Sequence, residues 1–116
     1  VPPNAEYEEG FAHWVNKIAK LSVELSIPIH LNCNEATHQS VLKFAKENKV
    51  TMTMEFKEFR DWDDFLIISR EIDDTDLIIL VSARKGYISY FGHMDRIPLK
   101  LERHFPNLSK MVIYPQ

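Results

Sequence analysis

The sequence predicts an α/β protein in which helices cover both faces of a doubly wound, mostly parallel sheet. Residues 76–86 read DLIILVSARKG, a continuous apolar run that ends in small and basic residues before a glycine. Such a run is typical of a strand buried on both faces. Helical and strand patterns alternate along the chain with short links, which favours a parallel sheet. The 116 residues, 45% hydrophobic and 27% charged, fit one globular domain over 1–116.

The first two predicted elements are a helix and a short strand. The helix is expected from about residue 5 to 25, because apolar residues recur at helical spacing and Asn4 can cap it. In residues 27–31 the apolar Ile27, Ile29 and Leu31 stand at every second position, which predicts a strand with these three on one side. Pro28 should lie at its start or on a free edge, because proline cannot donate to a strand ladder.

The next two predicted elements are a capped helix and an outer strand. Asn34 is expected to cap a helix that ends near Asn48. Residues 51–56 alternate cleanly between apolar and polar, so one face should be exposed or lightly covered. That pattern favours an edge strand.

The second half of the sequence predicts a helix before the central strand, a helix after it, and then a final strand. Acidic residues in 61–64 precede an apolar helix expected over about 65–72. Their negative charges would stabilise the N-terminal, positive end of its dipole. Asp95 is expected to cap a fourth helix, with Pro98 in its first turn, where a missing N–H costs nothing. Residues 111–114 close the chain as a strand.

Composition excludes several classes of protein. No stretch approaches the ~20 apolar residues that span a bilayer. Cys33 is the only cysteine, so no internal disulfide framework is expected, and we predict a buried or half-buried thiol. The five histidines lack metal-ligand spacing, so no metal is predicted. The net charge is −3, and the basic residues of the C-terminal third are too sparse for nucleic-acid binding.

Residues 76–86 resemble the fourth strand and following loop of the universal stress protein fold, a Rossmann-like architecture. The segment KMVIYP at 110–115 resembles the last strand of that family. The family's five parallel strands lie in the order 3-2-1-4-5. The resemblance implies that the strand at 51–56 is an outer strand. It also implies that strand one is largely missing from this chain and survives only as Val1.

A narrower resemblance covers FRDWDDFL at 59–66, SARKGYISY at 82–90 and the terminal IYP. These segments are similar to the cytoplasmic tails of bacterial sodium/proton antiporters, which carry stress-protein-like domains, often in tandem. The resemblance implies that the chain is the last such domain, cut from a longer transporter at the cytoplasmic face of the inner membrane. The implied partners are a sister domain, the membrane transport domain and a second copy of the chain, with no nucleic acid.

The family's nucleotide motif is incomplete here. Nucleotide-binding stress proteins carry Gly-x-x-Gly, nine residues, then Gly and Ser or Thr, which together hold the phosphates. On this alignment the glycines fall on Ala83 and Gly86, and the later pair falls on Arg96 and Ile97. One glycine of three is kept, the hydroxyl is missing, and no aspartate stands near Val1. We therefore expect no cofactor, with a nucleotide kept as the open alternative.

The candidate ligand-binding residues lie where open α/β sheets place their ligands, beyond the end of the central strand. Three of them, Arg84, Lys85 and Arg96, would hold an anion by charge and are called the basic edge below. The competing interpretation is an edge kept for packing and docking. The whole candidate set is Ser82, Ala83, Arg84, Lys85, Gly86 and Arg96.

Several residues near this edge have two interpretations. Tyr87, Tyr90 and Phe91 can stack on a base or fill the groove beside the central strand, and we favour the groove. His93 would change charge near neutrality and can act as a pH sensor. Trp62, among acids, is expected to pack or dock at a domain contact.

No convergent acid, base and nucleophile is visible, so we predict that the protein is not an enzyme. Ser82 and Ser89 lack the Gly-x-Ser-x-Gly pattern of a nucleophile elbow. The expected function is a regulatory or assembly domain of a sodium/proton antiporter, open to an anionic or nucleotide ligand. The alternative is a stand-alone universal stress protein that binds ATP or another nucleotide.

Overall fold

The protein forms a mixed α/β structure with two pairs of parallel strands. The structure is a computed structural model that describes residues 1–60, 64–92 and 94–115. Strand β1 (Ile29–Cys33) pairs with β2 (Met54–Glu58), and β3 (Leu77–Val81) pairs with β4 (Ser109–Ile113). Ile29 lies opposite Met54, and Leu77 lies opposite Ser109. The predicted α/β class is therefore confirmed.

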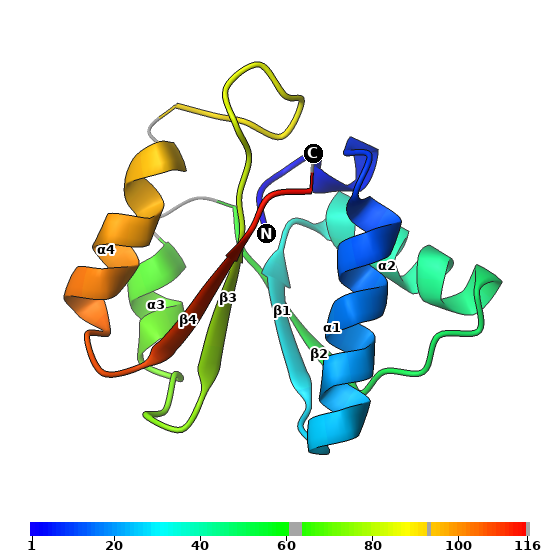
Figure 1. Ribbon diagram of the computed structural model, residues 1–116, viewed down its shortest axis with the longest axis horizontal. Helices are drawn as coiled ribbons and strands as arrows, with labels where there is room; N and C mark the ends of the chain where they lie inside the picture. The colour runs from blue at the N-terminus through cyan, green and yellow to red at the C-terminus, as the bar shows by residue number, and fades with distance from the viewer. Residues whose placement is uncertain (61–63, 93, 116) are drawn as a thin grey trace.

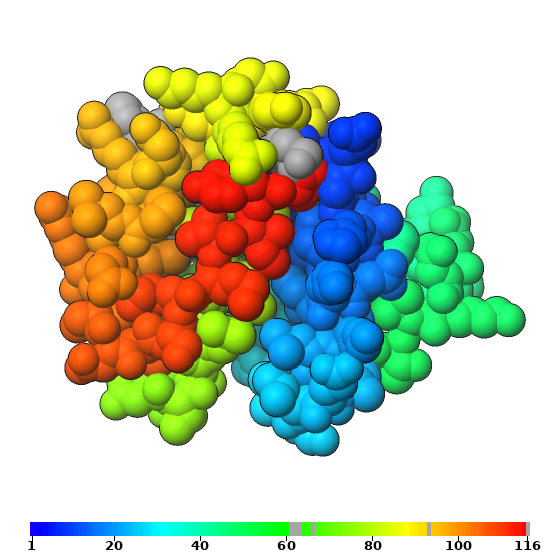
Figure 2. Space-filling view, viewed as in Figure 1, coloured from blue at the N-terminus to red at the C-terminus, as the bar shows by residue number. Residues whose placement is uncertain are grey.

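Helices flank these strands on two sides (Figure 1). Helices α1 (Phe11–Leu25) and α2 (Glu35–Glu47) lie on one side, and α3 (Phe65–Ser69) and α4 (Ile97–His104) lie on the other. Two short 3₁₀ turns, η1 (Ala5–Tyr7) and η3 (Met94–Arg96), precede α1 and α4. Figure 2 shows that the C-terminal segment, in red, lies between α4 and α1 on one face of the molecule.

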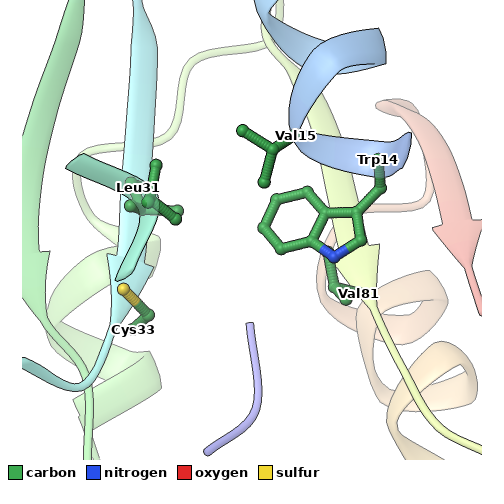
Figure 3. Close-up of a cluster of buried hydrophobic side chains, with 6 residues drawn as sticks. Trp14, Val15, Leu31, Cys33 and Val81 are labelled. Atoms are coloured by element: carbon green, nitrogen blue, oxygen red, sulfur yellow. The ribbon is translucent and has the colours of Figure 1, made fainter. Parts of the chain in front are cut away.

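Two apolar cores lie on the two sides of β3. The first joins α1, α2 and β1 to β3 and includes the buried Trp14, Leu31 and Val81. Figure 3 shows its β1 members on one side and its α1 members, with Val81, on the other. The second joins α3, η3 and α4 around the buried Leu80. Since successive strand residues face opposite sides, Leu80 and Val81 each serve one core.

The prediction of a single helix over residues 5–25 is wrong at the start of the helix. Asn4 has φ 68° and precedes η1 without a capping hydrogen bond, and α1 begins only at Phe11, with Gly10 as its N-cap. The cause is tertiary. The Gly10 N–H donates to the Pro115 carbonyl at 2.6 Å, so the chain leaves the helical path to hold the C-terminal segment.

Two other sequence predictions need correction. Asp95 was expected to cap α4, but it lies inside η3 and Arg96 takes the N-cap position. Strand β3 is buried on both faces only at Leu80 and Val81, and its first three residues are half-buried. The second difference arises because a cavity of about 740 Å³ lies between β1 and β3, and the first three residues of β3 line it.

Other predictions are confirmed. The Asn34 side chain accepts a hydrogen bond from the Thr37 N–H at 2.8 Å and caps α2. Among the described strands β2 pairs only with β1, as expected of an outer strand. Pro28 lies just before β1, and Pro98 lies in the first turn of α4.

Candidate ligand-binding edge at the end of strand β3

The loop after β3 begins buried and then turns into solvent. The Ser82 N–H donates to the Ile113 carbonyl at 2.8 Å, which extends the β3–β4 pairing by one step. Ser82 and Ala83 are buried, whereas Lys85 and Gly86 are exposed. Gly86 has φ 91°, a value that residues with a Cβ rarely adopt, so a glycine suits this turn.

The three residues of the basic edge come from two segments, the loop after β3 and η3. The Arg84 guanidinium lies 4.9 Å from the centroid of the Tyr114 ring, a cation–π contact with the residue after β4. Lys85 is exposed in the loop, and Arg96 is exposed in η3. Anion binding by these residues stays a prediction.

A buried carboxylate holds the far part of this loop. Glu8 Oε1 accepts hydrogen bonds from the Ser89 N–H at 2.9 Å and from the Ser89 hydroxyl at 2.6 Å. Glu8 is only 7% exposed and Ser89 3%. Sequence reasoning missed this pair because the residues are far apart in the chain and neither belongs to a motif.

An apolar cavity of about 300 Å³ lies under the loop, beside the carboxyl end of β3. None of the six candidate ligand residues lines it. Tyr90 and Phe91 do, in agreement with the groove-filling interpretation, whereas Tyr87 is about half exposed and does not. The main contributors are residues 1–4, Phe59, Arg60, Leu80, Val81, 88–91, Met94 and Ile97.

Cys33 and His38 are packed against other parts of the structure. Cys33 is fully buried, as expected, and burial raises the pKa of its thiol to about 11. The thiolate is therefore scarce at neutral pH. The His38 ring stacks on the Phe56 ring, with 3.8 Å between the ring centroids. Within the described ranges, no three His, Cys, Asp or Glu side chains gather as a metal site would require.

Some predicted features fall outside the described residues. These are Asp61, Trp62, Asp63 and His93. Asp64 is described, and its carboxylate accepts from the Arg60 N–H at 3.0 Å instead of capping α3.

None of the helices that the structure describes is long and apolar enough to cross a bilayer. No protein-family model, curated protein or solved structure matches the chain.

Proposed function

We propose that this chain is a non-catalytic regulatory or assembly domain of a sodium/proton antiporter, with a doubly wound sheet of the universal stress protein type. The resemblance of residues 59–66 and 82–90 to the cytoplasmic tails of those transporters supports the assignment. Ion transport would occur in a membrane part of the same polypeptide. The domain would act by contacting that part, a sister domain or a second copy of itself.

The arrangement of the strands supports the proposed fold type. Strand β2 lies beside β1, and β4 lies beside β3, with each pair parallel. Helices α1 and α2 lie on one side and α3 and α4 on the other (Figure 1). Both features fit the order 3-2-1-4-5, with the place of strand one between β1 and β3.

The observation that supports a docking role is the hydrogen bond from the Ser89 N–H to the Glu8 side chain. In a phosphate-binding loop, backbone N–H groups point toward the anion. Here the Ser89 N–H donates to the buried Glu8 side chain and is therefore not available to a phosphate. The arrangement secures the loop to the N-terminal segment, which favours a docking role over nucleotide binding.

Exposed apolar side chains offer a contact surface for such docking. Leu99 on α4 and Met111 and Val112 on β4 are each more than a third exposed. Strand β4 also pairs only with β3 among the described strands, so its outer edge is open. Open edges and apolar side chains are features of surfaces that associate.

Transport assays test the role directly. In inverted membrane vesicles that carry the polypeptide containing residues 1–116, Na⁺-dependent proton exchange is followed with a pH-sensitive dye, before and after deletion of these residues. We expect exchange to persist while its half-activating pH or Na⁺ concentration shifts at least threefold. The Gly92→Ala variant, which places a methyl group in open space, serves as the control. Absence of the polypeptide from membranes, or identical profiles, would contradict the proposal.

Calorimetric titration separates the alternative function. ATP and AMP are titrated into the chain and into a variant with alanine at all three positions of the basic edge. Our proposal expects no saturable heat with either nucleotide. Saturable ATP binding that vanishes in this variant would favour the stand-alone nucleotide-binding protein. A variant with alanine at the exposed Lys17, Lys20 and Lys43 changes the charge equally and serves as the control.

A further inference from the structure

The cavity under the loop after β3 has the size of a small-molecule site. Its volume is about 300 Å³. An apolar protein cavity of about 150 Å³ stays dry and holds a benzene molecule. Pockets that bind small organic molecules begin at about 300 Å³. The cavity therefore has room for a molecule of about two fused rings.

One wall of the cavity is apolar and firmly packed. Leu80 at the end of β3, Met94 in η3 and Ile97 at the start of α4 line it, and each is less than a tenth exposed. All three belong to the second apolar core. Because close-packed core side chains keep their positions, this wall is formed before any molecule binds to it.

The loop after β3 supplies another wall. Ile88 and Phe91 line the cavity, and both side chains are more than a third exposed. Between them, the Ser89 N–H and hydroxyl both donate to Glu8, which holds this stretch of the loop in place. An apolar molecule in the cavity would remove part of this apolar surface from water, and that removal favours binding.

Aromatic rings and a thioether make the lining selective among apolar molecules. Phe59 follows β2, and Tyr90 and Phe91 belong to the loop after β3. Aromatic rings attract one another in offset-stacked and edge-to-face arrangements. The sulfur of a methionine, here Met94, also makes favourable contacts with rings. This lining therefore favours a flat aromatic molecule over an aliphatic one.

The charged groups of the lining residues have other partners. The Arg60 Nε donates to Glu58 Oε1 at 2.9 Å, and most of the Arg60 side chain is exposed. The Val1 amine donates to the Asn32 carbonyl at 3.0 Å, and burial lowers its pKa to about 6, so it is mostly neutral at pH 7.5. No carboxylate is among the described residues that line the cavity. A charged molecule would lose hydration there without gaining a dedicated partner, which favours an uncharged one.

We propose that this cavity binds an uncharged aromatic molecule of one or two rings, in the class of the indoles and substituted benzenes. The site is separate from the basic edge, because none of the six candidate ligand residues lines it. The proposal goes beyond the regulatory function and holds whether or not the domain belongs to a transporter.

Methyl NMR with indole as the probe tests the site. The protein is labelled with ¹³C at the methyl groups of Ile, Leu and Met, and indole is titrated to low millimolar concentration at pH 7.5. We expect saturable shifts of the Leu80, Met94 and Ile97 methyl signals, with a dissociation constant below about 1 mM. The methyl groups of Leu99 and Met111 are exposed and lie outside the cavity, so they serve as controls and should not shift.

A matched pair of variants separates the cavity from other apolar surface. Ile88 lines the cavity and Ile67 on α3 does not, and the two are 58% and 55% exposed. Ile88→Asp places a charge at the cavity and should weaken indole binding at least fivefold, whereas Ile67→Asp should leave it unchanged. The methyl spectrum of each variant without indole shows whether its fold is kept. Equal effects of the two substitutions would overturn the assignment.

Two further titrations test the chemical class of the ligand. Indole-3-carboxylate adds a negative charge to the same ring system and should bind at least fivefold more weakly than indole. AMP at the same concentration should not displace indole. Binding of the carboxylate as tight as that of indole or tighter, displacement by AMP, or the absence of saturable shifts in the parent protein would each overturn the proposal. A failed transport assay would leave all these readouts unaffected.

Discussion

The buried amine of Val1 should make the stability of chain 1–116 depend on pH in a calculable way. Burial lowers the pKa of this amine from 8.0 to about 6, a shift that the nearby Cys33 thiol opposes. The perturbation is acetylation of the amine, which removes its titration and keeps one N–H for the Asn32 carbonyl. All side chains are chemically the same in the two forms.

The sign follows from proton counting. Between about pH 6 and 8 the unfolded amine binds more protons than the folded one, so the free energy of unfolding rises with pH. Below pH 6 both states are protonated, and the full cost of burying the charge is present. A shift of two pKa units at 1.36 kcal/mol each corresponds to about 2–3 kcal/mol.

Urea unfolding, followed by circular dichroism from pH 5 to 9, measures this cost. The acetylated chain should exceed the free chain by about 2–3 kcal/mol more at pH 5.5 than at pH 8.5. A difference that does not vary with pH would show that the amine is hydrated, and would refute its buried placement beside the Asn32 carbonyl.

Three further predictions concern contacts described above. Gly10→Ala should lower the free energy of unfolding by about 2–4 kcal/mol in a thermal or urea melt, because its Cβ would lie 2.5 Å from the Pro115 carbonyl oxygen. Gly92→Ala, whose Cβ would lie in open space, should stay within about 0.5 kcal/mol of the parent. Equal stability of the two variants would contradict the C-terminal docking. Glu8→Ala should cost about 2–3 kcal/mol by leaving buried Ser89 donors unpaired, and Glu8→Gln should cost less, a ranking that denaturant midpoints can check. Asn34→Ala should lower stability by about 1 kcal/mol through loss of the α2 cap, and no change in urea melts would count against that cap.

Much of the fold could be predicted because its signals are local. The Asn34 cap depends on a partner three residues away, and the inner face of α4 follows from helical spacing at Ile97 and Leu101. The apolar run that forms β3 was recognisable for the same reason. The partial exposure of β3 was not recognisable, because the half-buried character of Leu77 comes from the cavity between β1 and β3, which depends on how distant strands are placed.

The candidate site was harder to predict because its determinants are distant in sequence. The basic edge was proposed from residues that are consecutive or aligned to a motif, yet the structure places Arg84 against Tyr114, thirty residues further on. The buried acceptor at the loop is Glu8, which lies near the start of the segment that was expected to form one helix over residues 5–25. A glutamate that stabilises the start of a helix and a glutamate that binds a remote loop look the same in the sequence.

The first ten residues show why these misses share one cause. Val1 bonds to β1, Glu8 holds the loop after β3, and Gly10 binds the C-terminal Pro115. The contacts of Glu8 and Gly10 fall within the segment whose local pattern favours a helix, and together with that of Val1 they bring β1, the loop and the C-terminal segment against one short stretch.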